Sequence, residues 1–270
     1  MVAPLVTLTT DFGTADGYAA AVKGVLAAAA PRARIVDLSH EVPAHDVSAG
    51  AWLLLRAAPF FPAGTIHLAV VDPGVGTHRR GLLVELAGQL FVGPDNGLFS
   101  LLPLRLPGSP RTVALERGRF PPRPGASVVF DGRDLFAPAA AALANALAGE
   151  PADAVRNLDL AAWGRPIDDW TRLAWTEPRA EGRDWVGEVV RIDRFGNAIT
   201  SLTPAHGRGP LQAAGRTISR GRAYADAAGG EPVALEGSSG FLEIAVRTGS
   251  AAERLKLRLG DAVRLAADHG

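Results

Sequence analysis

The hydrophobic and polar positions of the first half of the chain alternate between two patterns. Short aliphatic and β-branched runs predict strands, and Ala-rich or amphipathic segments between them predict helices. The expected strands are 5–10, 34–38 and 65–71, and the expected helices are 18–30, 46–56 and 135–148. Strands that alternate with helices are typical of an α/β domain, here expected to be Rossmann-like, with a mainly parallel sheet and flanking helices.

Less regular segments lie between these elements. A hairpin is expected from residues 82–86 and 90–92, followed by a tight turn at 93–97 and a short helix near 98–102. The Pro-, Gly- and Arg-rich stretch 107–125 predicts an irregular connection. A short strand is expected at 128–130, directly before the last helix.

The second half has a different pattern, because short strand-like runs follow one another between glycines without a convincing helix. These runs are 185–193, 198–202, 215–218, 232–235, 241–246 and 262–265. Such a pattern predicts a small β-barrel. We therefore expect an N-terminal α/β domain at 1–168, a linker at 169–183 and a C-terminal β-barrel at 184–270.

Composition narrows the classes of function. The 270 residues carry no formal net charge and no cysteine, which argues against a nucleic-acid partner, disulfides and thiolate metal sites. The six histidines form no HxH or HxxxH pair, so no metal site is expected. The N-terminus begins as a strand without a basic segment, and no apolar run is long enough to span a bilayer. We expect a cytoplasmic protein without a membrane partner.

The segment 70–80, VVDPGVGTHRR, has the strongest local signal for a ligand site. A buried strand delivers Asp72 at its carboxyl end, and a Gly-rich turn allows Arg79 to meet that carboxylate. Asp11 and Asp131 also follow expected strands, so the three acids are expected at one edge of the sheet. Any one of them taken alone is more simply interpreted as a turn or cap residue. Together they suit a cationic or hydroxyl-rich small molecule.

Three common motif classes are missing: the GxGxxG fingerprint, the GxxxxGK[ST] phosphate loop and the GxSxG nucleophile elbow. Dinucleotide oxidoreductases, P-loop NTPases and α/β-hydrolases are therefore disfavoured. In the second half, Phe195 and Tyr224 read either as core residues or as platforms for a base. Gly237 to Gly240 reads as a hairpin or as a nest of N–H groups for a carboxylate.

Several longer stretches together resemble one family, the S-adenosyl-L-methionine (SAM) hydroxide adenosyltransferases or SAM hydrolases, which are related to fluorinases and chlorinases. The matching stretches are TLTTDFGTADGYAAAVKGVL (7–26), DLSHEVPAHDVSAGA (37–51), VVDPGVGTHRR (70–80), FVGPDNGLFS (91–100), FDGRDLFAPAAA (130–141), RIDRFGNAITSL (191–202), YADA (224–227) and SSGFLEIAV (238–246). They cover both halves in the family's order. The resemblance implies a homotrimer with the ligand between the N-domain of one subunit and the C-domain of its neighbour.

The resemblance also implies the reaction: water or hydroxide attacks C5′ of SAM, and adenosine and L-methionine form without a metal or other cofactor. Asp72 and Arg79 match two of the three residues that position the water. By the same resemblance, Asp11 binds the ribose, Asp193 and Ser238 hold the methionine end, Phe195 and Tyr224 sandwich adenine, and Asn197 bonds its edge. Asp16, Phe130 and Gly132 are expected to line the substrate.

One departure from the family pattern concerns the reaction itself. The usual F-H-G-R-D reads Phe130-Asp131-Gly132-Arg133-Asp134, so Asp131 replaces the expected histidine. A carboxylate can act as a base, but two close carboxylates resist joint ionisation, so we expect one to hold a proton with a raised pKa. We expect activity that is lower than in a histidine-bearing relative. Smaller departures are Gly237 and Arg247, where the family usually has Asn.

Two alternatives to SAM hydrolysis follow from the same residues. A SAM-dependent halogenase is disfavoured, because the halogenase relatives lack the acid and the arginine kept here as Asp72 and Arg79. The long insertion that fluorinases carry after this turn is missing too. A non-catalytic protein that binds SAM or adenosine is the other alternative, and Asp131 is the reason to consider it.

Overall fold

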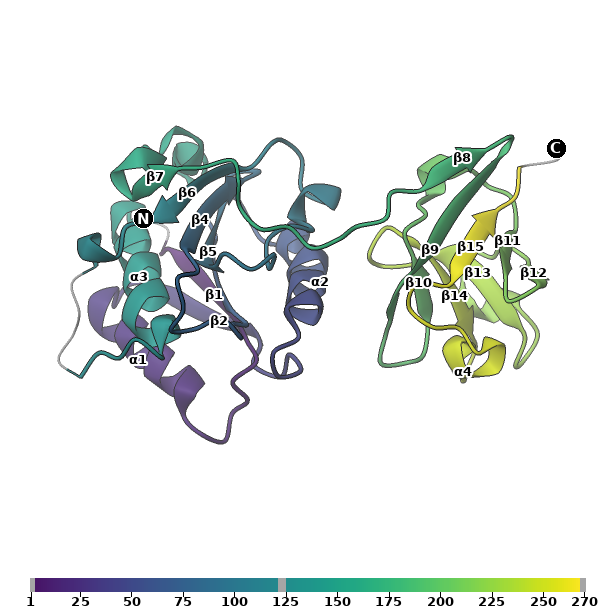
Figure 1. Ribbon diagram of the computed structural model, residues 1–270, viewed down its shortest axis with the longest axis horizontal. Coiled ribbons are helices and arrows are strands. Elements are labelled where there is room, and N and C mark those ends of the chain that lie inside the picture. The colour runs from purple at the N-terminus through teal and green to yellow at the C-terminus, as the bar shows by residue number, and fades with distance from the viewer. Residues whose placement is uncertain (1–2, 121–124, 268–270) are drawn as a thin grey trace. The chain divides into compact units, whose positions relative to one another are not determined.

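The computed structural model describes residues 3–120 and 125–267, and contacts within the chain divide it into two compact units, Met1–Leu173 and Ala174–Gly270 (Figure 1). The expected irregular stretch 107–125 includes residues 121–124, which lie outside the described residues. None of the described helices is long and apolar enough to cross a membrane.

The first unit is built on one seven-stranded sheet with the order β2-β1-β3-β5-β4-β6-β7. Its strands are β1 (Leu5–Thr10), β2 (Arg34–Ser39), β3 (Ile66–Val70), β4 (Gly81–Leu86), β5 (Gln89–Pro94), β6 (Arg111–Leu115) and β7 (Gly164–Pro166). The pairs β2–β1, β1–β3 and β3–β5 are parallel. The pairs β5–β4, β4–β6 and β6–β7 are antiparallel, so the sheet is mixed rather than mainly parallel.

Helices cover both faces of this sheet (Figure 1). They are α1 (Tyr18–Ala29), α2 (Val47–Ala57) and α3 (Ala137–Ala146). One core packs α1 and α3 against alternate side chains of β1 and β3, such as Leu8 and Leu68. The other core packs α2 against the opposite face. Successive residues of β3 therefore point into opposite cores, and nearly every residue of β1 and β3 is buried.

The expected elements of the first unit are confirmed for three strands, three helices and the hairpin β4–β5. Two expectations are wrong. The stretch 107–125 contains β6, which pairs with β4 although its sequence is broken by charge and proline on both sides. Residues 128–130 are turn rather than strand, and Val128 and Val129 are exposed instead of paired.

The second unit is a nearly closed antiparallel sheet with the order β12-β11-β15-β9-β10-β14-β13, and β8 pairs with β9. Its strands are β8 (Arg179–Glu181), β9 (Asp184–Ile192), β10 (Ala198–Thr200), β11 (Leu211–Ala213), β12 (Arg216–Ile218), β13 (Pro232–Glu236), β14 (Leu242–Val246) and β15 (Ala262–Leu265). A bridge from Arg220 to Ala234 joins the chain after β12 to β13. Side chains from most strands fill one interior core, as expected for a small barrel.

This unit departs from the expectation in three elements. Strand β11 was not predicted, and strand β8 lies in the segment expected as a linker. A short helix, α4 (Ala251–Leu255), lies between β14 and β15 and is capped by the Ser250 hydroxyl, which accepts from Glu253 N. Its five residues are too few for a helical period to show in the sequence.

The segment 169–183, expected as a linker, contributes to both units. Trp170 is buried in the second core of the first unit, and Thr171 N donates to Asp95. Arg179–Glu181 forms strand β8 of the second unit.

Candidate functional site

Hydrogen bonds within the Gly-rich turn after β3 hold Asp72 and Arg79 in place. Thr77 N and Oγ1 both donate to Gly74 O, at 3.2 and 2.7 Å, and Gly74 N donates to Asp72 Oδ1 at 3.2 Å. Gly76 has a φ of 81°, a backbone conformation that a side chain would strain. Seven residues after Asp72, the chain has therefore reversed and returns Arg79 to that carboxylate.

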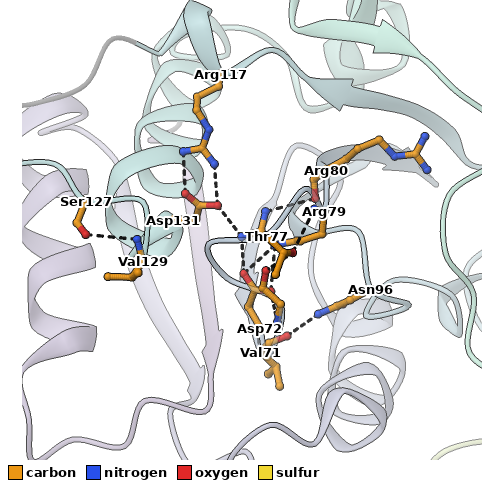
Figure 2. A network of polar contacts seen from close by, with 11 residues as sticks. Val71, Asp72, Thr77, Arg79, Arg80, Asn96, Arg117, Ser127, Val129 and Asp131 are labelled. Carbon is orange, nitrogen blue, oxygen red and sulfur yellow. Dashed lines mark hydrogen bonds and ion pairs between the residues drawn. The ribbon is translucent and has the colours of Figure 1, made fainter.

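Arg79 lies between two buried carboxylates (Figure 2). Its Nε donates to Asp72 Oδ1 and Oδ2 at 3.0 and 2.9 Å, and its Nη2 contacts both Asp72 Oδ2 and Asp131 Oδ2, the latter at 2.6 Å. The side chains of Asp72, Arg79 and Asp131 are 5%, 9% and 3% exposed. Arg79 is therefore a buried residue and not a solvated surface arginine. Its guanidinium also lies 5.1 Å from the ring of Phe136.

Asp131 reaches this cluster from a helix start rather than from a strand end. The chain leaves the turn at 128–130 and enters a π-helical turn, Gly132–Phe136, that continues into α3. The cluster thus joins a strand end to a helix start, and the expectation that Asp131 follows a strand is wrong. The two acids nevertheless converge, because the strand end and the helix start both lie beside Arg79 (Figure 2).

A second arginine, Arg117, holds Asp131 from the other side. Arg117 Nη1 lies 2.7 Å from Asp131 Oδ1, and Arg117 Nη2 donates to Asp131 Oδ2 at 2.8 Å (Figure 2). The guanidinium thus meets both carboxylate oxygens, one through a charge-assisted hydrogen bond and the other through an ion pair. We define the residues Asp72, Arg79, Asp131 and Arg117 as the carboxylate–arginine cluster.

The cluster keeps Asp131 ionised. Burial by itself would raise the pKa of the Asp131 carboxyl, but the hydrogen bonds from Arg117 and Arg79 outweigh it and hold that pKa below its ordinary value. The same pairing raises the pKa of Arg117. The expectation of a protonated carboxyl with a raised pKa is therefore wrong for Asp131, since two guanidinium groups compensate its charge.

The other expected residues of the first unit lie in loops. Asp11 Oδ2 accepts from His45 N at 2.8 Å, which ties the turn after β1 to the loop before α2. Asp16 is exposed just ahead of α1. Phe130 packs edge-on against Phe12 and Tyr18, and buried Gly132 lies against the rings of Phe12 and Phe130.

The expected adenine residues of the second unit share one surface pocket. A pocket of about 580 Å³ is lined by Phe195, Asn197, Tyr224, Val246, Arg247, Thr248 and Gly249. Phe195 is 76% and Tyr224 46% exposed, so both rings are available to a flat ligand rather than packed in the barrel. Arg247, at a position where the resemblance led us to expect Asn, lines the same pocket.

Asp193 shapes the loop that presents these residues. Its Oδ1 accepts from Phe195 N and Asn197 N, both at 2.9 Å, and its Oδ2 accepts from Asn197 Nδ2 at 3.1 Å. Ser238 is exposed in the turn between β13 and β14. Structure and sequence agree that these residues lie in loops, and their contacts with substrate remain a prediction.

Two polar residues at these sites were missed by sequence reasoning. Arg117 lies in the Arg-rich stretch that read as irregular, so nothing marked it among its neighbours. Glu243 is buried on β14, and its Oε1 accepts from the Tyr224 hydroxyl at 2.8 Å. A Cβ at Gly237 would lie 2.1 Å from Glu243 Oε2, so in this structure the Glu243 side chain occupies the space that a side chain at position 237 would need. An acid at an inward position of a strand was the signal that could have identified Glu243.

Among the described residues, no group of three or more His, Cys, Asp or Glu side chains is arranged to hold a metal ion. The acids of the carboxylate–arginine cluster are bound by arginines instead.

The geometry can now be compared with known proteins. The family described as SAM hydroxide adenosyltransferase matches with its N-terminal domain over residues 6–153 and with its C-terminal domain over residues 187–264. This chain belongs to that family. The SAM hydroxide adenosyltransferase match over 6–153 contains the carboxylate–arginine cluster, and the match over 187–264 contains the aromatic pocket. The resemblance stated from the sequence is confirmed.

Individual members of the SAM hydroxide adenosyltransferase group are similar over nearly the whole chain. A Thermus thermophilus protein named (R)-S-adenosyl-L-methionine hydrolase is 43% identical, with 95% of this chain and 97% of that protein covered. An Actinopolyspora mzabensis protein named fluorinase is 27% identical, with 97% of each covered. A crystal structure of an uncharacterized conserved protein from Thermotoga maritima superposes with a TM-score of 0.79 at 29% identity, covering 97% and 99% of the two chains.

Proposed function

We infer that this protein is a SAM hydrolase that converts SAM and water to adenosine and L-methionine. The observation that carries the inference is the buried guanidinium of Arg79, fixed between Asp72 and Asp131 at the edge of a sheet. Relatives named (R)-S-adenosyl-L-methionine hydrolase, at 43% and 38% identity over nearly the whole chain, support the same reaction.

In this reaction the leaving group needs little assistance from the protein, whereas the nucleophile needs more. The water oxygen forms a bond to C5′ of the ribose while the C5′–S bond breaks. The electron pair of the broken C5′–S bond stays on sulfur and neutralises the sulfonium. Methionine leaves as an uncharged thioether, and the water loses one proton. Because water is a poor nucleophile, the site has to orient it and accept that proton.

The cluster can supply both tasks. Arg79 uses Nε and Nη2 for the carboxylates, while its Nη1 makes a contact of 3.4 Å to Arg80 O. We propose that Nη1 orients the water and that Asp72 accepts its proton. Two carboxylates also favour the positively charged sulfonium in the ground state, which Arg79 and Arg117 moderate.

The remaining roles form the binding part of this proposal. Asp11 binds the ribose hydroxyls, Asp16 faces the same ligand, and Phe130 and Gly132 line the reacting end. Phe195, Tyr224 and Asn197 bind adenine, and Asp193 and Ser238 bind the methionine end. The aromatic pocket supports the adenine assignment, because stacking between rings is the usual way in which proteins hold a base.

We propose that the parallel half of the sheet, β2-β1-β3-β5, is the Rossmann-like part, since β1 and β3 lead into Asp11 and Asp72 at their carboxyl ends. We further propose that the two units are separate domains at 1–168 and 184–270, and that three copies assemble with each site shared by neighbouring subunits. No metal or other cofactor enters the proposed reaction. Sedimentation velocity tests the trimer.

One experiment separates hydrolase, halogenase and binder. The purified protein is incubated with SAM, with and without chloride, and the products are separated by chromatography. Equal amounts of adenosine and methionine are expected under both conditions. Formation of 5′-chloro-5′-deoxyadenosine would identify a halogenase. Tight binding of SAM without either product would identify a non-catalytic binder.

A further inference from the structure

The charge of the site depends on an arginine outside the expected catalytic set. Asp72, Arg79 and Asp131 alone carry one excess negative charge, which the protein has buried. An uncompensated buried charge costs free energy. It also makes the ionised form of any other nearby carboxylate less stable. Arg117 brings the sum of the four side chains to zero.

Arg117 is built to reach this carboxylate. It begins the 3₁₀ turn Arg117–Arg119 just after β6, and its guanidinium spans from solvent, with the side chain 57% exposed, to Asp131, whose side chain is 3% exposed. Arg117 Nη2 donates to Asp131 Oδ2 at 2.8 Å, and Arg117 Nη1 makes an ion-pair contact of 2.7 Å with Asp131 Oδ1, an atom without a hydrogen-bond partner among the described residues. The contact therefore fixes the plane of the carboxylate as well as its charge.

We propose that Arg117 is a positioning residue for hydrolysis, which fixes Asp131 as a permanent anion aimed at Arg79. This inference rests on the proposed function. Asp131 is then a bridge between two arginines rather than a proton acceptor, and that leaves Asp72 to take the proton from water. Together, Arg117 and Asp131 replace the uncharged histidine expected at position 131 with a pair of zero net charge.

Neighbouring charges do not duplicate this role. Arg133 is paired with Asp134, with Nη2 at 2.6 Å from Oδ2. Asp134 acts on Arg117 only through its field, which adds to the raised pKa of Arg117. Asp72 faces Arg79, and within the part of the chain that the structure describes Arg79 and Arg117 are the ion-pair partners of Asp131.

The first test is Arg117→Gln, measured by adenosine release across pH 3 to 8, so that the range extends below the ordinary pKa of an aspartate. We expect kcat to fall about tenfold, within the coupling range of contacting charged residues, with KM changed by less than about threefold. An acid limb in the kcat profile should move upward by about one pH unit, since Asp131 loses one of two compensating charges. Arg117→Lys should restore most of kcat. Arg119→Gln is the matched control, because Arg119 lies in the same turn and pairs with exposed Glu116.

The second test restores neutrality in another way. Asp131→His alone leaves Arg117 without its partner, and we expect about a tenfold lower kcat. The double variant Asp131→His with Arg117→Gln should return to within about threefold of the wild type, since its net charge is again zero. Thermal unfolding checks that each variant is folded.

The outcomes are distinguishable. If the wild type releases adenosine, the proposed hydrolase function stands. The role of Arg117 is then overturned if the losses of kcat in the two single variants multiply in the double variant. It is also overturned if the pH profile of Arg117→Gln is the same as that of the wild type. A loss in Arg119→Gln as large as in Arg117→Gln overturns it too. Wild type that releases no adenosine overturns the proposed function, and the role of Arg117 in the reaction falls with it.

Discussion

The two units prepare their polar groups in opposite ways. In the first unit, the carboxylate–arginine cluster is bound together before any ligand arrives, and its two acids and Arg79 are almost fully buried. In the second unit, the pocket of Phe195 and Tyr224 is open, and Phe195 is mostly exposed. The cluster proposed to carry out the reaction is fixed by ion pairs, whereas the pocket proposed to bind the substrate has exposed aromatic rings.

The two regions therefore contribute differently to the free energy of folding and to the free energy of ligand binding. A buried network fixes geometry and field, and its loss leaves charges without partners. An exposed ring contributes little to folding and gains its energy from stacking on a ligand. Changes in the carboxylate–arginine cluster should therefore affect kcat and stability together, and changes in the pocket should affect KM.

The largest effect is expected from Arg79→Gln. It removes the donor between two buried carboxylates, so kcat should fall at least about 100-fold, and the free energy of unfolding should fall by about 3 kcal/mol. Adenosine release and urea unfolding measure the two effects. Arg111→Gln is the control: Arg111 pairs at 2.8 Å with buried Glu85 on neighbouring β4, so stability should fall while kcat stays. Equal losses of kcat in both variants would contradict a specific role for Arg79.

The next effect is on pH-dependent stability and comes from His67 on β3. Burial lowers the pKa of His67 to about 4 from an ordinary value of 6.5, although a hydrogen bond to Gln89 opposes the shift. His67 therefore binds a proton near pH 6.5 in the unfolded chain but only near pH 4 in the folded chain. This contribution is complete above pH 6.5, and about 3 kcal/mol of it is lost as the pH falls to 4.

Urea unfolding at several pH values measures this loss. His67→Gln keeps a polar side chain that does not titrate, so the slope of its unfolding free energy between pH 6.5 and 4 should be smaller. An unchanged slope would show that the acid sensitivity of the first unit comes from other groups. His206, the described histidine of the second unit, is only partly buried, and His206→Gln serves as the comparison.

Phe195→Ala should raise KM for SAM roughly tenfold, because one face of the adenine site loses its stacking partner. The free energy of unfolding should hardly change, since the side chain is 76% exposed. Phe60→Ala is the matched control, because Phe60 is an equally exposed phenylalanine of the first unit at 74%. A fall in kcat with KM unchanged would contradict the division between the two regions.

The smallest effect is expected from Tyr224→Phe. The ring stays, but buried Glu243 loses the hydroxyl donor at 2.8 Å, so stability should fall by about 1 kcal/mol. KM should rise less than in Phe195→Ala. Tyr18→Phe, at the other tyrosine of the chain, provides the stability control. A rise in KM larger than that of Phe195→Ala would show that the hydroxyl binds substrate directly.

Local sequence patterns were sufficient for most of the fold. The short aliphatic and β-branched runs of β1 and β3 determine that they are strands, and the hydrophobic spacing of α1 and α2 determines that they are helices. The pattern was insufficient for β6, α4 and the turn at 128–130. A short edge-proximal strand or a five-residue helix forms because neighbours are present to pair or pack with it, and no local pattern records those neighbours.

The sequence by itself determined which residues could take part: the Gly-rich turn that joins Asp72 to Arg79, the substitution at Asp131 and the aromatic residues of the second unit. Only the tertiary structure decided the charge state of the site. Arg117 is 14 residues from Asp131 along the chain and 38 from Arg79, and it lies in a segment without a pattern. Electrostatic compensation depends on distances of a few ångströms through space, which chain folding sets and residue spacing does not.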